Sequence, residues 1–78
     1  MIGNVLRYMR RKNNFKQEQI SKITGVARNT VSQYETETIP PTFETIEKIA
    51  NECGYKIYFE SNDGKERFQS KEINRKEV

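Results

Sequence analysis

The chain has 78 residues, of which 33% are hydrophobic and 32% are charged, and its formal net charge at pH 7 is +3. This length fits one domain with a small core, and the absence of histidine excludes a histidine-based catalytic triad, general base or zinc site. No stretch approaches the roughly 18 apolar residues of a membrane span, no signal-peptide pattern opens the chain, and one cysteine excludes an internal disulfide. We therefore expect a cytoplasmic protein that is not an enzyme, needs no cofactor or metal and does not enter a membrane.

Charge is distributed unevenly along the chain. Residues 1–33 have a net charge of +6, residues 34–60 of −4, and residues 61–78 of +1. A basic part joined to an acidic part indicates a face turned towards a polyanion, although ordinary solvated surface would give the same pattern.

Apolar residues at helical spacing predict two helices in the first 25 residues. Ile2, Leu6 and Met9 share one side of a helix over residues 2–12, which Asn13-Asn14 ends because asparagine tolerates the left-handed conformation. A second, shorter helix contains Ile20 and Ile23, and Gly25 stops it.

Two further helices are predicted between Gly25 and Gly54. The third packs inward through Ala27, Val31 and Tyr34. A loop at Pro40-Pro41 separates it from a fourth helix, which Thr42 caps and Gly54 ends. The apolar stripe of the fourth helix consists of Phe43, Ile46, Ile49, Ala50 and Cys53. A thiol on such a stripe is typical of an inert, buried cysteine.

The periodicity changes after Gly54. Tyr55, Ile57 and Phe59 alternate with more polar residues, which predicts a half-buried strand over residues 55–60. Asn62-Asp63-Gly64 is a turn signal, and residues 65–70 could return as a weak hairpin arm. We expect residues 71–78 to form a flexible tail.

The outward side of the third helix carries the most specific signal. At about 100° per residue, Arg28, Asn29, Ser32 and Gln33 gather opposite the inward stripe. These side chains match base edges in a DNA major groove, since arginine pairs with guanine and asparagine or glutamine with adenine. A merely solvated helix face usually carries stronger helix formers such as Glu and Lys. We therefore interpret this face as base-reading, with Gly25 allowing the helix to turn and protrude.

Residues 2–54 resemble the phage repressor and Cro-like (Xre) helix-turn-helix family. The segments that carry the resemblance are "IGNVLRYMRR", "KQEQISKITGVARNTVSQYE" and "PPTFETIEKIANECG". The resemblance implies an all-α, lambda-repressor-like helix-turn-helix bundle of about four helices, followed here by a C-terminal β-strand or hairpin. It also implies that Gln17 touches a DNA phosphate, that Thr30 lies where backbone contacts are possible, and that Arg10 and Glu35 form an ion pair. We divide the chain into a DNA-binding domain at 1–54, a dimerising strand or hairpin at 55–70 and the tail at 71–78.

The sequence departs from the family pattern at two kinds of position. Lys16 and Ala27 stand where the family usually has Ser or Thr caps, at a typical cost of about 1 kcal/mol each. The loop after the third helix contains Glu37, which would repel phosphate. We therefore expect the phosphate contacts to come from Gln17, Lys16, Arg11 and Lys12.

The expected function is that of a sequence-specific transcription regulator, a repressor, that binds a palindromic operator in double-stranded DNA as a homodimer. Tyr55, Ile57 and Phe59 are the candidate dimerisation residues because a lone strand leaves an unpaired edge; alternatively, Tyr55 and Ile57 only close the monomer core. One alternative function is an antitoxin that also binds a toxin protein through residues 55–78. Another is a protein-interaction module without DNA binding.

Overall fold

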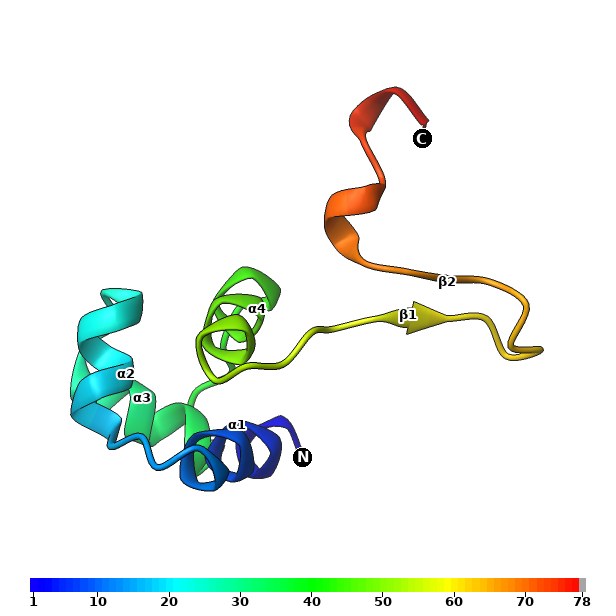
Figure 1. Cartoon of the computed structure of the whole chain (residues 1–78). Helices are drawn as coiled ribbons and strands as arrows, with labels where there is room; N and C mark the ends of the chain where they lie inside the picture. Colours follow the sequence, from blue (N-terminus) through cyan, green and yellow to red (C-terminus); the bar gives the residue numbers. More distant parts are fainter. Residues whose placement is uncertain (78) are drawn as a thin grey trace.

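The computed structural model describes residues 1–77 and consists of four helices followed by a projecting hairpin (Figure 1). The helices are α1 (Ile2–Lys12), α2 (Gln17–Thr24), α3 (Arg28–Glu35) and α4 (Phe43–Glu52). Two short strands, β1 (Phe59–Glu60) and β2 (Arg67–Phe68), pair antiparallel, and two 3₁₀ turns follow, η1 (Ser70–Glu72) and η2 (Arg75–Glu77). The predicted fold class, four helices with a C-terminal hairpin, is confirmed.

The helices end where the sequence predicts. Asn14 and Gly25 take the left-handed conformation, with φ of 62° and 75°, and reverse the chain after α1 and α2. Thr42 caps α4 by accepting the Thr45 backbone N–H at 3.2 Å. Lys16 offers no side-chain cap to α2, but the Gln19 side chain accepts the Lys16 N–H at 2.7 Å and supplies half of a capping box.

One core joins all four helices. Its buried residues are Leu6 and Met9 from α1, Ile20 from α2, Val31 from α3, and Ile49, Ala50 and Cys53 at the end of α4. α1 packs against α3 and α4, and α2 packs against the same two helices. Burial raises the pKa of the Cys53 thiol, which keeps this side chain in its neutral form within the core.

Three residues predicted to face the core are instead exposed. Ile23 is 37% exposed, because Thr24 takes the inward place and donates its hydroxyl to the Ile20 carbonyl at 2.7 Å. Phe43 is 41% exposed, since it starts α4 beyond the end of the core, and its ring lies against the Phe59 ring in a tilted arrangement. Ala27 is exposed as the N-cap of α3.

The strand predicted over residues 55–60 is wrong for most of its length. Only Phe59 and Glu60 pair with a second strand, opposite Phe68 and Arg67 respectively. Tyr55 and Ile57 are half-buried against the helical core, and the Tyr55 N–H bonds to the Ala50 carbonyl at 2.8 Å. Alternation therefore reflected packing on one side rather than strand pairing, because no second strand of the described chain lies beside residues 55–58.

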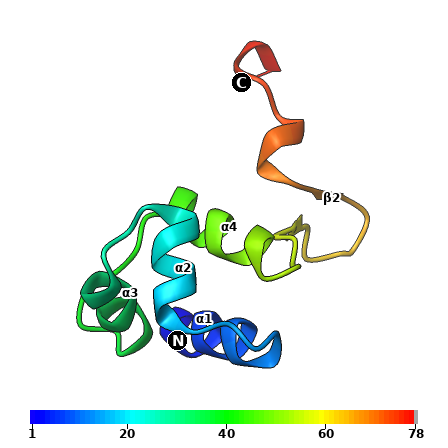
Figure 2. The ribbon, with the colours of Figure 1, turned by 60° about the vertical axis from the view of Figure 1, so that its left-hand side comes forward.

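The hairpin turns at Gly64, which has a φ of 74°, and projects from the bundle (Figure 2). The Cα radius of gyration is 13.9 Å, whereas a compact chain of this length would give roughly 11–12 Å. Residues 70–77 contain the two 3₁₀ turns. The expected mobility of residues 71–78 stays a prediction, and Val78 lies outside the described residues.

A close approach between α1 and the end of α3 depends on Gly3. A Cβ atom at this position would lie 2.6 Å from the Tyr34 carbonyl, the Glu35 carbonyl and the Glu37 Cγ. Two of these atoms belong to backbone that cannot move aside cheaply. Gly3 therefore lets the first turn of α1 rest directly on the C-terminus of α3, at the point where α3 must be held.

Replacing Gly3 with alanine tests this contact. In an open helix the change stabilises by roughly 0.5–1 kcal/mol, but here overpacking should destabilise by about 1–3 kcal/mol. Urea unfolding followed by circular dichroism would measure the difference, with exposed Asn4→Ala as the control on the same helix. A G3A variant as stable as the wild type would contradict the close approach.

Candidate nucleic-acid interface

A buried ion pair fixes the end of α3 to α1. Arg10 Nε donates to Glu35 Oε2 at 2.6 Å, and Arg10 Nη2 donates to Glu35 Oε1 at 2.9 Å. Both residues are buried, at 8% and 4% exposure, and Arg10 Nη1 also donates to the Phe15 carbonyl at 2.9 Å. A two-point contact of this kind sets the orientation of both side chains as well as their distance. The pair implied by the family resemblance is therefore present in the structure, and both of its residues are buried.

Gln17 extends this pair to the start of α2. Its side-chain amide donates to Glu35 Oε1 at 3.1 Å, so one carboxylate joins α1, α2 and α3. Arg7 Nε lies 3.7 Å from the same oxygen and adds positive charge. Gln17 thus stands at the helix N-terminus, where backbone N–H groups and the helix dipole favour an anion, while its side chain braces α3.

Ionisation of Glu35 is favoured by its neighbours. Burial acts to raise the pKa of the Glu35 carboxyl, but the hydrogen bonds from Arg10 and Gln17 and the charges of Arg10 and Arg7 outweigh it. The net result is a pKa below the ordinary value for glutamate. The hydrogen bond to Glu35 likewise raises the pKa of Arg10, so both partners stay charged at neutral pH.

The four candidate base-reading residues lie on the outer side of α3. Arg28 and Asn29 are exposed, and Ser32 and Gln33 are half-buried. Val31, on the opposite side of the helix, is buried in the core. None of the four side chains has a hydrogen-bond or ion-pair partner among the described residues. Their donors and acceptors are consequently free to meet a ligand, while the helix that carries them is fixed from behind.

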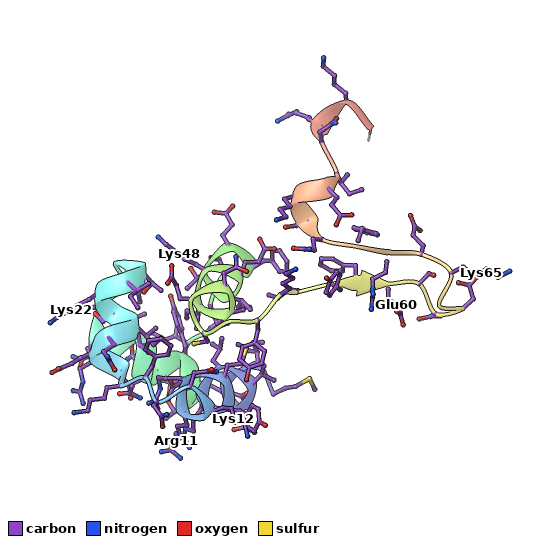
Figure 3. The ribbon with its side chains drawn as sticks, viewed as in Figure 1. Arg11, Lys12, Lys22, Lys48, Glu60 and Lys65 are labelled. Atoms are coloured by element: carbon purple, nitrogen blue, oxygen red, sulfur yellow. The ribbon has the colours of Figure 1, made fainter. Side chains whose placement is uncertain are left out.

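The candidate phosphate contacts fall into two groups. Lys16, Gln17 and Arg28 line, together with Glu18, an open hollow of about 360 Å³ between the starts of α2 and α3. Arg11 and Lys12 are exposed at the end of α1, away from the hairpin (Figure 3). Thr30 is half-buried on α3. The structure thus brings Lys16 and Gln17 next to a base-reading residue and leaves Arg11 and Lys12 on a separate element.

Glu37 is engaged within the protein rather than presented as a free acid. It has a left-handed φ of 63°, and its carboxylate accepts the Gly3 backbone N–H at 2.9 Å and pairs with the Met1 amino group. An anion at the first turn of α1 is favoured by the helix dipole. The expectation that Glu37 simply repels DNA phosphate therefore needs correction, because the Met1 amino group and the Gly3 N–H offset part of its negative charge.

Sequence reasoning missed several residues that hold this arrangement. Gly3, Gln19 and the capping role of Glu37 were not foreseen, and neither was Lys48, whose ammonium donates to the Thr24 carbonyl at 3.2 Å at the end of α2. A signal existed for Gly3, since glycine in the first turn of a helix is unfavourable unless something approaches closely. No local pattern marks Lys48, whose contact joins residues 24 positions apart.

The geometry is that of a helix-turn-helix: α2 and α3 are joined by a tight turn at Gly25, and α3 presents an unpaired polar face. The model of the family described as "Helix-turn-helix" (HTH_3) matches residues 6–59. The chain therefore belongs to the helix-turn-helix family of phage repressor and Cro-like (Xre) DNA-binding proteins.

Among curated proteins, the chain is similar to the cryptic phage CTXphi transcriptional repressor RstR of Vibrio cholerae, at 35% identity over 57 residues. That alignment covers 73% of this chain and 51% of the relative, so the chain spans about half the length of the curated relative that it matches. No solved structure gives a significant match. Within residues 1–77, no helix has the length and apolar character needed to cross a membrane.

Acid titration tests the role of the ion pair. Because the folded pKa of Glu35 is below its unfolded value, the stabilisation is complete above the unfolded pKa, near 4.5, and is lost as pH falls through the folded pKa. Glu35→Gln should destabilise by about 3–5 kcal/mol at pH 7, because it leaves Arg10 buried without its counter-charge, and should flatten this acid dependence.

The measurement is the free energy of unfolding at several pH values between 3 and 7. Glu52→Gln is the matched control, since Glu52 is exposed and should change stability by less than about 0.5 kcal/mol. If E35Q and E52Q have the same stability at pH 7, the ion pair does not hold α3.

Proposed function

We propose that this protein is a sequence-specific transcription regulator, a repressor, that reads double-stranded DNA through the outer face of α3. The observation that carries the proposal is the unpaired face of Arg28, Asn29, Ser32 and Gln33 on a helix fixed from behind by Arg10 and Glu35. Family membership and the similarity to a phage transcriptional repressor support it.

Arg28 and Gln33 are assigned to guanine and adenine edges, respectively, because each side chain can make two hydrogen bonds to such an edge in the major groove. Asn29 can recognise adenine in the same way, and Ser32 can donate or accept. A helix anchored on one side can place these groups with little loss of conformational freedom on binding, since only the side chains need to order.

Phosphate contacts are assigned to Gln17, Lys16, Arg11 and Lys12, with Thr30 as a further backbone contact. Gln17 is favoured because it combines a helix N-terminus with a side chain already bonded to Glu35. A phosphate held there would fix the position of the braced end of α3 relative to the duplex.

A dimer on a two-fold operator is part of the proposal, because one short α3 reaches only a few base pairs. We assign the contact between protomers to the region of Tyr55, Ile57 and Phe59. Such a regulator acts where its operator lies, and the proposal therefore places it in the cytoplasm, acting by binding rather than by catalysis. No described feature favours the antitoxin alternative, and the local pairing of Glu37 removes the main support for a module that does not bind DNA.

Alanine substitution at the base-reading positions tests the proposal. Arg28→Ala and Gln33→Ala should each relax preference at one base position by about 1–3 kcal/mol, because one bidentate contact is lost. Fluorescence anisotropy with duplexes selected from a random pool by the wild type gives the measurement. Lys65→Ala, an exposed basic residue at the hairpin tip, is the control and should leave preference intact (Figure 3). Unaltered preference in both α3 variants would refute the assignment.

Substitution of the phosphate contacts should give a different signature. Lys16→Ala or Arg11→Ala should weaken binding to all duplexes similarly and lower the slope of log affinity against log salt by about 1. Affinity measured across a salt series, for the selected duplex and a scrambled duplex, distinguishes this from loss of specificity. A salt slope identical to that of the wild type would contradict a phosphate contact at the substituted residue.

A further inference from the structure

One side of α1 meets the end of α3 through three residues spaced a helical turn apart. Gly3, Arg7 and Arg10 fall at i, i+4 and i+7, which places them on the same side of α1. Gly3 lies against the backbone carbonyls of Tyr34 and Glu35. Both arginines approach the Glu35 carboxylate. This side of α1 therefore brings two positive charges to one negative charge.

The Glu35 carboxylate is already occupied by Arg10 and Gln17. Oε1 accepts Arg10 Nη2 at 2.9 Å and the Gln17 side-chain amide at 3.1 Å, while Oε2 accepts Arg10 Nε at 2.6 Å. A carboxylate oxygen has two lone pairs, so Oε1 has no position left for a third strong donor. Arg10 Nη1 donates to the Phe15 carbonyl, and only 10% of the Arg10 side chain is exposed. The charges of Arg10 and Glu35 are thus matched to each other inside the protein.

Arg7 is the cation that this pairing leaves over. Its Nε lies 3.7 Å from Glu35 Oε1, which is too far for a hydrogen bond. That Nε is buried and has no hydrogen-bond partner among the described residues, which is uncommon because an unsatisfied buried donor costs free energy. The Arg7 side chain as a whole is 40% exposed, so the exposed part lies away from its Nε. An anion from outside the chain would give this guanidinium the partner that Glu35 does not supply.

The start of α2 indicates which anion can reach Arg7. Arg7 Nε and Gln17 Nε2 lie 3.7 Å and 3.1 Å from the same Glu35 oxygen, so the two side chains are neighbours. Gln17 is the first residue of α2, where free backbone N–H groups and the helix dipole favour an anion. The planar guanidinium of arginine matches the geometry of phosphate oxygens. A phosphate group at the start of α2 is therefore beside the one guanidinium of this cluster that its own chain does not use.

We propose that Arg7, together with Gln17, binds the DNA phosphate that lies at the start of α2. The inference rests on the proposed binding of duplex DNA and adds a phosphate-binding residue on α1, next to the buried ion pair. The bound phosphate supplies the acceptor that Glu35 cannot offer and neutralises the excess positive charge of the cluster. Arg7 contributes affinity rather than base preference, because phosphate groups are the same at every base pair.

Arg7→Met tests the proposal, because methionine keeps an unbranched side chain and removes the guanidinium. For the selected and the scrambled duplex alike, R7M should lower the slope of log affinity against log salt by about 1. The accompanying loss of affinity should be roughly eightfold at 0.1 M salt relative to 1 M salt, and equal for both duplexes. Arg7→Lys should restore the slope, since the slope counts charges at phosphates rather than hydrogen bonds. Arg75→Met is the matched control, because Arg75 is exposed in η2 and should leave affinity and slope unchanged.

Urea unfolding of the same variants separates this role from a purely structural one. If Arg7 only stabilises Glu35, R7M lowers the urea midpoint and keeps the salt slope of the wild type, and that result overturns the inference. It would leave the proposed function in place as long as the wild type still prefers the selected duplex. Conversely, a wild type without preference between the duplexes, combined with a reduced slope for R7M, would refute base reading by α3 and support the phosphate contact. A wild type that binds neither duplex overturns both.

Discussion

The orientation of α3 depends on one buried carboxylate. Glu35 receives two hydrogen bonds from Arg10 and one from Gln17, so the last residue of α3 is tied to α1 and to the start of α2. Burying a charge is costly unless its partners are fixed, and here the same residues that satisfy Glu35 define how the helices cross. In the proposed function, these contacts at Glu35 hold α3 in place while its outer face meets DNA.

Close packing reinforces the ion pair at the same place. Gly3 admits the backbone of α3 to within a distance that no side chain would allow, and Glu37 then caps α1 from the loop that follows α3. The two ends are thus locked together by an ion pair, a hydrogen bond and a steric constraint. These contacts use none of the hydrogen-bonding groups on the outer face of α3, because the side chains of Arg28, Asn29, Ser32 and Gln33 take no part in them.

The helical spacing of apolar residues, together with the residues that end or cap helices, was sufficient to predict the helical part of the fold. Gly25, Thr42 and Gly54 act locally, through backbone conformation or a cap, and so their effect can be inferred from neighbours in sequence. The segment after Gly54 was harder, because alternation at Tyr55 and Ile57 arises equally from a strand and from an extended chain packed on helices. Pairing depends on where a second strand lies, which alternation does not specify.

In the candidate site, too, local features could be predicted from the sequence and contacts between distant residues could not. The outward side of α3 followed from helical geometry alone, whereas the contacts that hold it join residues far apart in the chain, such as Arg10 with Glu35 and Gly3 with Glu37. The first of these was available only through the family resemblance. The second requires a glutamate at a left-handed φ to turn back to α1, which no local pattern encodes.

The most direct measurement of the central claim is the NMR spectrum of the labelled protein with a selected duplex. Cross-peaks should join the side-chain amides of Asn29 and Gln33 and the Arg28 guanidinium to major-groove base protons, while the buried Arg10 guanidinium keeps its free-protein resonance. If the duplex instead perturbs the resonances of the hairpin and leaves those of α3 unchanged, α3 is not the element that reads DNA.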